Sequence, residues 1–403
     1  MTTTDSGFAS VEICAGAGGQ ASGLHDAGFR HHALIEIDEH ACATLKANVD
    51  ESTSSDGAET TSVADGEVEE ESGSAVIRAD LTEFDPGSLG LEEGVLDLLA
   101  GGVPCPPFSV AGKQLGQDDE RDLFPTMLSM IEELSPKAVM IENVRGLLDQ
   151  KFERYREDVI ERRLEDAGYK ICFWDIVEAC DYGVPQLRPR AILLALREPY
   201  AKHFVWREPE PDAVLTVADA LAPSMYERFR ESGEDPRWKG KYAQRWKIAY
   251  DLWLEKARSS PFAPTLVGGS KKHGGADLGP TRAKVAWEKL GVCGLGVAND
   301  QDKMTDPERD LYAKRGPKLT VRQAAIIQGF PATWKILGRK TAAYRQVGNA
   351  FPPPVAKAMG EMIIEALEAE AKSRAVPYEL PIPSALRAEP ADRGSDLERA
   401  CIG

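Results

Sequence analysis

Long apolar runs are absent from this 403-residue sequence, in which no stretch reaches the roughly 18 consecutive apolar residues of a membrane-spanning helix. The first residues, MTTTDSGFAS, also lack the basic and apolar regions of a secretory signal peptide. The seven cysteines are an odd number and form no C-x-x-C pair, which argues against a zinc cluster and a complete disulfide framework. We therefore expect a cytoplasmic protein with no membrane span and no bound metal.

Positive charge is in the minority, since 48 Lys and Arg stand against 65 Asp and Glu and give a net charge of −17. The charges are unevenly distributed. Residues 50–71 contain nine acidic side chains and no basic one, whereas residues 222–345 contain 24 Lys and Arg against 13 Asp and Glu. The basic block is suited to a polyanion partner, but charge alone is equally compatible with an ordinary solvated surface.

Short apolar segments alternate with helical patterns in the first half of the chain. Strands are predicted at 10–14, 33–38, 76–80, 95–102, 138–144, 171–177 and 190–196, with a helix around 123–134. This alternation predicts an α/β fold with a parallel, doubly wound sheet. The stretch between 50 and 75 has almost no large apolar residue to offset the entropy of ordering, so we expect a disordered acidic insertion there.

The composition changes near residue 198. Residues 200–320 contain five of the seven tryptophans and the Gly- and Lys-rich stretch VGGSKKHGG, which indicates a second, smaller domain. An apolar helical pattern from Val355 to about Ala371 again suits packing on a sheet. We expect a first domain at 1–198, a smaller domain at 199–330, a C-terminal segment at 331–372 that returns to the first domain, and a loose tail at 373–403.

A glycine-rich turn follows the first predicted strand. Gly16, Gly18 and Ala21 satisfy the dinucleotide-binding pattern G-x-G-x-x-G/A, and Glu36 ends the second strand, where an acidic side chain can accept ribose hydroxyls. This motif alone leaves three interpretations open: an NAD site, a site for another adenosine-containing cofactor, and a structural turn without a ligand.

Cys105 directly follows another apolar strand, in the sequence GGVPCPPFS. A lone cysteine is usually a small buried hydrophobe. This one, however, is flanked by Pro104 and Pro106 at the carboxyl end of a strand, where open α/β sheets place their sites. Glu142 ends the next strand at the same edge, where it could cap the following helix or act as an acid beside a thiolate. The combination favours covalent catalysis over hydride transfer.

These motifs and several later ones resemble, in order and over nearly the whole chain, the bacterial DNA (cytosine-5) methyltransferases. The matching motifs are Ala15-Gly16-Ala17-Gly18-Gly19, Glu36, Asp80, Pro104-Cys105, Glu142-Asn143-Val144, Gln186-Leu187-Arg188-Pro189-Arg190, Leu319–Pro331 and Gly348-Asn349. The resemblance implies a Rossmann-like, S-adenosylmethionine-dependent methyltransferase sheet with a smaller target-recognition domain.

The resemblance further implies that S-adenosyl-L-methionine is the cofactor and S-adenosyl-L-homocysteine the product. The implied cofactor-binding residues are Cys14, Ala15, Gly16, Ala17, Gly18, Gly19, Glu36, Ile37, Asp80, Leu81, Pro104, Leu123, Asn349 and Ala350. Cys14 and Ile37 stand where the family commonly has larger side chains.

Catalysis would begin with attack of the Cys105 thiolate on carbon 6 of a cytosine flipped out of duplex DNA, while Glu142 donates to ring N3. Arg190 and Arg188 would hold the cytosine oxygen and a phosphate, unless they are ordinary surface arginines. Candidate DNA contacts are Ser109, Gln186, Lys271, Lys272, His273 and Arg282. Gln186 could instead position its loop, and the glycines around Lys271 could simply form a mobile surface loop.

The expected partner is double-stranded DNA, bound by a monomer, and a cognate restriction endonuclease could act on the same site. Two other functions stay open at this stage. An NAD-dependent oxidoreductase would explain the glycine turn and Glu36 but not Cys105 or Glu142. A catalytically silent DNA-binding relative would explain the basic block but not the presence of both catalytic side chains.

Overall fold

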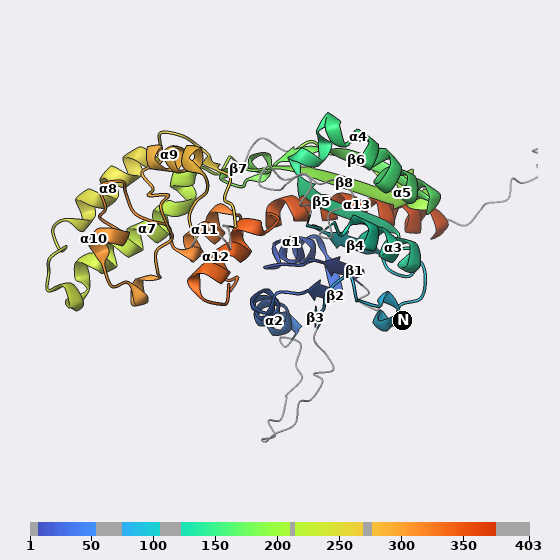
Figure 1. Ribbon diagram of the computed structural model, residues 1–403, viewed down its shortest axis with the longest axis horizontal. Helices are drawn as coiled ribbons and strands as arrows, with labels where there is room; N and C mark the ends of the chain where they lie inside the picture. Colours follow the sequence, from blue (N-terminus) through green and yellow to red (C-terminus); the bar gives the residue numbers. More distant parts are fainter. Residues whose placement is uncertain (1–6, 54–74, 105–121, 210–213, 269–275, 376–403) are drawn as a thin grey trace, which may run out of the picture.

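The computed structural model describes residues 7–53, 75–104, 122–209, 214–268 and 276–375. They form two lobes on opposite sides of Figure 1. One contains the sheet and its helices, and the other, the helical lobe, contains the helices of residues 217–310. The helices at 321–327 and 340–349 lie between the two. The strands are β1 (Phe8–Ile13), β2 (Phe29–Glu36), β3 (Val76–Arg78), β4 (Leu98–Gly101), β5 (Ala138–Val144), β6 (Tyr169–Glu178), β7 (Gln186–Leu187), β8 (Pro189–Arg197) and β9 (Ala263–Pro264). The α-helices are α1 (Gly19–Ala27), α2 (Glu39–Thr53), α3 (Phe124–Leu134), α4 (Glu153–Tyr155), α5 (Arg162–Asp166), α6 (Glu198–Ala201), α7 (Val217–Glu234), α8 (Trp246–Ala257), α9 (Thr281–Lys289), α10 (Pro307–Asp310), α11 (Val321–Ile327), α12 (Lys340–Asn349) and α13 (Pro353–Ala375).

The large sheet has seven strands in the order β3-β2-β1-β4-β5-β8-β6. Strands β1 to β5 pair with one another in parallel. Strand β8 runs antiparallel to both of its neighbours, β5 and β6. The predicted all-parallel sheet is therefore wrong at one strand. The short connection from β6 to β8 has no room for a crossover helix, so the chain reverses direction.

Both faces of the sheet are covered, as a doubly wound arrangement requires. One face packs Val11, Leu99 and Val139 against α3, and the other packs Leu98, Met140 and Leu194 against α1 and α13. The predicted α/β class is confirmed by this architecture.

The C-terminal helix α13 lies directly against α1, at close range. A Cβ added to Gly23 of α1 would lie 2.2 Å from the carbonyl oxygen of Pro353, so only glycine permits this approach. The helix predicted at 355–371 thus exists and extends to Ala375, which removes residues 373–375 from the expected loose tail. The remainder of that tail, 376–403, lies outside the described residues.

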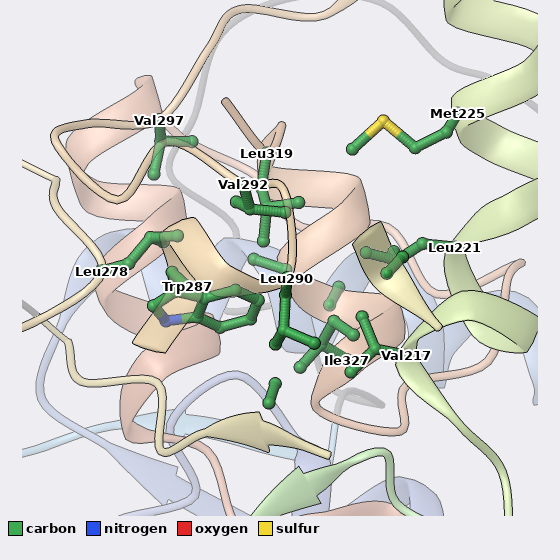
Figure 2. Packing of buried hydrophobic residues seen from close by; sticks show 14 of the residues in the cluster. Val217, Leu221, Met225, Leu278, Trp287, Leu290, Val292, Val297, Leu319 and Ile327 are labelled. Carbon is green, nitrogen blue, oxygen red and sulfur yellow. The ribbon is translucent and has the colours of Figure 1, made fainter. Parts of the chain in front are cut away.

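The helical lobe has its own hydrophobic core. Fully buried Trp287 of α9 lies among apolar side chains from α7, α11 and the loops around Val292 and Leu319 (Figure 2). Residues Tyr344 and Val347 of α12 belong to this same core, so α12 contacts both lobes.

Two expected boundaries differ from the structure. Trp206 stacks on Phe173 of β6 with ring centroids 3.6 Å apart, so the first lobe continues past residue 198. The acidic insertion expected at 50–75 is narrower at both ends, because α2 continues to Thr53 and the Ala75 carbonyl accepts a hydrogen bond from Leu34 N–H. The rest of the insertion, 54–74, lies outside the described residues.

Candidate active site

A cavity of about 700 Å³ opens at the carboxyl edge of β1, β2, β4 and β5. This edge is the usual ligand-binding position in open α/β sheets. The residues predicted to bind the cofactor that line it are Cys14, Ala15, Gly16, Ala17, Glu36, Ile37, Asp80, Leu81, Pro104, Leu123, Asn349 and Ala350. Glu142 lines the same cavity, so the structure brings the predicted cofactor residues and one predicted catalytic residue together.

The glycine turn owes its shape to a series of left-handed residues. Cys14, Gly16 and Gly18 have φ angles of 52°, 56° and 78°. Gly18 and Gly19, also predicted to bind the cofactor, are not among the residues that line the cavity, and they permit close packing instead. A Cβ at Gly18 would lie 2.7 Å from the Trp334 ring, and one at Gly19 would lie 2.2 Å from the Phe351 carbonyl oxygen. Trp334 and Phe351, both from the C-terminal part of the chain, therefore pack against these glycines and support the turn.

Glu36 is fixed at the cavity wall by backbone donors. Its Oε2 accepts from Gly16 N–H at 2.8 Å, and its Oε1 accepts from Ile37 N–H at 2.9 Å and Asp38 N–H at 2.8 Å. The neighbouring Ile37 side chain is 57% exposed although it is apolar. The carboxylate and this apolar surface offer adjacent recognition elements for a ribose and a flat ring.

Asp80 and Cys14 carry different charges at neutral pH. Hydrogen bonds from the Thr82 N–H and hydroxyl to Asp80 lower the pKa of its carboxyl, which is therefore ionised. Burial, followed by the charges of Glu36 and Asp80, raises the pKa of Cys14 to about 12. The Cys14 thiol is consequently neutral and poorly suited to act as a nucleophile.

Glu142 is paired with Arg190, whose Nε lies 2.6 Å from the Glu142 Oε1. Gly102 leaves room for this carboxylate, because a Cβ at that position would lie 2.8 Å from Glu142 Oε2. The adjacent Asn143 is buried and donates from Nδ2 to the Val103 carbonyl at 3.0 Å. Asn143 thereby fixes the chain just before Pro104. The predicted nucleophile Cys105 and the predicted DNA contact Ser109 lie outside the described residues.

Arg188 does not have the position expected of a substrate contact. It is fully buried and donates to the carbonyl oxygens of Leu266, Gly348 and Ala350 at 2.8, 3.0 and 2.9 Å. These carbonyls come from the helical lobe and from the segment around the end of α12. Both terminal nitrogens of the guanidinium are bonded to these carbonyls, and its buried Nε has no hydrogen-bond partner among the described residues. Arg188 therefore joins the lobes and is shielded from solvent.

Gln186 is also buried, contrary to its assignment as a DNA contact. Its Oε1 accepts from Leu266 N–H at 2.7 Å, and its Nε2 donates to Gln328 Oε1 at 2.9 Å. Its alternative assignment, positioning the loop, agrees with these contacts.

The remaining predicted DNA contacts lie in the helical lobe. Arg282 is exposed in the first turn of α9, and Lys271, Lys272 and His273 lie outside the described residues. The chain enters that stretch at Gly268, where a Cβ would lie 2.1 Å from Asn349 Oδ1. The backbone of the helical lobe therefore packs directly on a residue of the cofactor cavity.

Several cavity residues were not predicted from the sequence. They include Gln20, Asp38, Thr82, Arg345, Gln346 and Phe351. Two of them could have been predicted from the sequence. Arg345 and Gln346 lie about one helical turn before Asn349 and therefore share its face of α12.

Comparison with known proteins decides the family. A family model described as C-5 cytosine-specific DNA methylase matches residues 8–365. The chain belongs to this family. Its predicted identity as a DNA cytosine-5 methyltransferase is thereby confirmed, and the NAD-dependent oxidoreductase is excluded.

The relatives of this methylase include two bacterial enzymes. Type II methyltransferase M.NaeI of Lentzea aerocolonigenes is 46% identical over 370 residues, which cover 91% of this chain and 77% of the relative. Type II methyltransferase M.NgoMIV of Neisseria gonorrhoeae is 43% identical over 368 residues, with 90% and 99% covered.

Solved structures support the fold of the methylase. A putative DNA modification methyltransferase encoded within an Escherichia coli prophage has a TM-score of 0.54 at 20% identity, with 91% of this chain and 99% of that chain covered. The Entamoeba histolytica methyltransferase EhMeth has a TM-score of 0.55 at 15% identity, with 90% and 99% covered.

Among the described residues, none of the helices combines the length and apolar character required to cross a bilayer.

Proposed function

We propose that this methylase transfers a methyl group from S-adenosyl-L-methionine to carbon 5 of a flipped cytosine, through a covalent adduct with Cys105. The observation that carries this mechanism is the Glu142 carboxylate, which lines the cavity at the carboxyl end of β5 and is paired with Arg190. The chain leading to Cys105 is fixed beside it by the hydrogen bond from Asn143 to Val103. A nucleophile and a proton-handling carboxyl would thus meet at one edge of the sheet.

The cavity residues fit the proposed cofactor. The volume of about 700 Å³ lies within the range of small-molecule sites. Glu36 would accept hydrogen bonds from the ribose hydroxyls, Ile37 would pack on the adenine, and Asp80 would accept from its amino group. When bound, S-adenosylmethionine supplies an electrophilic methyl group on a sulfonium sulfur.

The remaining chemistry follows from the weak nucleophilicity of cytosine carbon 5. Addition of the Cys105 thiolate to carbon 6 breaks the 5,6 double bond and sends its electrons toward N3 and carbon 5. We propose that a proton shared between Glu142 and N3 moves to N3 as this charge develops, with Arg190 keeping the carboxylate in place. Carbon 5 would then take the methyl group, with S-adenosylhomocysteine as the neutral leaving group. Loss of the carbon 5 proton to a base, departure of the thiolate and return of the N3 proton to Glu142 would restore the aromatic ring.

The helical lobe is proposed to recognise double-stranded DNA. The basic excess of residues 222–345 falls on this lobe and on the segment that follows it. Lys and Arg side chains there would neutralise DNA phosphates. Lys271, Lys272, His273, Arg282 and Ser109 would contact DNA. We assign residues 1 to about 209 and α13 to the catalytic domain and 214 to about 330 to the target-recognition domain, with α12 shared.

We further propose that the protein is a cytoplasmic monomer that protects a specific DNA site. The relatives M.NaeI and M.NgoMIV are named type II methyltransferases, which suggests a cognate restriction endonuclease acting on the same site.

The function is tested by incubating the full-length protein with tritiated S-adenosylmethionine and mixed-sequence duplex DNA, followed by bisulfite mapping of methylcytosine. The expected result is methylation at carbon 5 within one short sequence. Glu142→Gln should lower the rate of incorporation by about a hundredfold or more. Glu132→Gln, which changes a surface carboxylate paired with Arg163, should leave it unchanged. A wild-type protein that binds DNA and transfers no methyl group would identify a catalytically silent relative.

A further inference from the structure

The last turn of α12 presents polar side chains to the cofactor cavity. Arg345, Gln346 and Asn349 line the cavity, while Tyr344 and Val347 of the same helix are buried in the core of the helical lobe. The spacing of these residues gives α12 two distinct faces. One wall of the cavity is thus a helix anchored from the opposite lobe.

Arg345 crosses from this wall to the strand side of the cavity. Its Nη2 lies 2.8 Å from Asp38 Oδ2, and their side chains are 25% and 33% exposed. The other Asp38 oxygen, Oδ1, accepts from His40 N–H at 3.0 Å and Ala41 N–H at 3.3 Å at the start of α2. Asp38 therefore uses one oxygen to cap α2 and the other to hold Arg345.

The ionisation state of Asp38 suits this contact. Burial is the largest single effect and acts to raise the pKa of the carboxyl, but the hydrogen bond from Ala41, the charge of Arg345 and the hydrogen bond from His40 together lower it. The carboxylate is therefore charged at neutral pH.

The α2–α12 contact has further support from hydrogen bonds that do not involve Arg345 or Asp38. The Thr44 hydroxyl donates to Gln346 Oε1 at 2.7 Å and accepts from Leu337 N–H at 2.9 Å, while Gln346 Nε2 donates to the Leu337 carbonyl at 2.8 Å. These bonds hold α2 and α12 together independently of Arg345. Loss of the ion pair should consequently alter the cavity rim without unfolding either element.

Resting on the proposed use of S-adenosylmethionine, we propose that Arg345 is a positioning residue for the adenosine half of the cofactor. Its pairing with Asp38 joins α12 to the turn that carries Ile37, beside the Glu36 carboxylate that accepts from the Ile37 and Asp38 N–H groups. The ion pair thereby sets the width of the cavity where the ribose and adenine bind. Arg345 acts through this wall and takes no part in methyl transfer.

The test measures affinities of the full-length protein by calorimetry for two ligands, S-adenosylhomocysteine and 5′-methylthioadenosine. Both contain the adenosine half, and only the first contains the amino-acid end. Arg345→Met and Asp38→Asn should each raise the Kd of both ligands by about fivefold, the size expected for one partly exposed ion pair. Asp38→Asn retains the Oδ1 acceptor that caps α2. Arg345→Lys should recover part of the affinity.

Two comparisons separate positioning from general stability. In the double variant Arg345→Met/Asp38→Asn the Kd should be no higher than in the single variants, because both remove the same contact. Arg163→Met removes the surface pair with Glu132 at 2.7 Å and should leave both Kd values unchanged.

An unchanged Kd in Arg345→Met, additive losses in the double variant, or a loss confined to S-adenosylhomocysteine would each overturn the assignment. The same conclusion would follow if Arg163→Met weakened binding equally. If the wild-type protein bound neither ligand, the proposed cofactor itself would be wrong, which is a separate outcome from a failure of Arg345 alone.

Discussion

Arg190 Nε lies 2.6 Å from Glu142 Oε1, and only 13% of each side chain is exposed. A carboxylate in this position is fixed in direction and shielded from much of the solvent. Removal of Arg190 would leave the Glu142 carboxylate without the group that holds its direction. The contact with Arg190 therefore fixes the direction of the Glu142 carboxylate and also balances its charge.

Glu142→Gln is expected to lower the rate of methyl transfer by about 10²- to 10⁴-fold, the usual contribution of a positioned acid or base. The amide cannot pass a proton to cytosine N3. Single-turnover measurements with saturating DNA and cofactor would separate this effect from binding. A variant that retains more than half of the wild-type rate would remove Glu142 from the mechanism.

Arg188 and Arg190 should respond differently to replacement by Met, although they lie two positions apart. Arg188→Met removes the Arg188 donor from the buried carbonyl oxygens of Leu266 and Gly348, and one of two donors from that of Ala350. It should lower the free energy of unfolding by about 3 kcal/mol or more. Arg190→Met should mainly lower the rate of methyl transfer. Chemical denaturation and single-turnover assays on both variants provide the comparison, and equal losses of stability would contradict it.

Gly268→Ala, a substitution in the helical lobe, is expected to weaken binding of the cofactor in the cavity. The new Cβ would lie 2.1 Å from Asn349 Oδ1, so this cavity residue must move. Gly296→Ala is a matched control, since its nearest neighbour would be a carbonyl oxygen at 3.7 Å. Calorimetric titration with S-adenosylhomocysteine should show a raised Kd for the first variant alone.

Cys14 should be chemically inert despite its place in the cavity. Because its pKa is raised to about 12, the thiol loses its proton only in strong alkali and is almost entirely protonated at pH 8. Cys14→Ser should therefore retain methyl transfer and the same sensitivity to iodoacetamide as the wild type. Loss of that sensitivity in Cys14→Ser would show that Cys14 is the reactive thiol.

The residues at the carboxyl edge of the sheet could be predicted from the sequence, because each belongs to a short local motif. Each strand ends next to a distinctive residue, such as Cys14, Glu36 or Glu142, and the parallel strands bring these ends together. The direction of β8 was not predicted, since an apolar strand pattern does not specify its orientation.

Contacts between distant segments were also missed. Arg188 was assigned to the substrate, but the carbonyls it binds lie 78 to 162 residues away along the chain. Nothing near Arg188 in the sequence distinguishes a buried arginine from one that faces a ligand. The pairing of Asp38 with Arg345, 307 residues apart, escaped prediction for the same reason.

The central claim is that Cys105 forms a covalent bond to cytosine carbon 6 during methyl transfer. It is tested most directly with duplex DNA that contains 5-fluorocytosine at the mapped target, incubated with S-adenosylmethionine. Because fluorine cannot leave carbon 5 as a cation, the wild-type protein should remain attached to DNA in a denaturing gel, with the linked peptide containing Cys105. Cys105→Ser should give no such adduct. A wild-type protein that methylates DNA without becoming trapped, or an adduct that forms equally in Cys105→Ser, would contradict the mechanism.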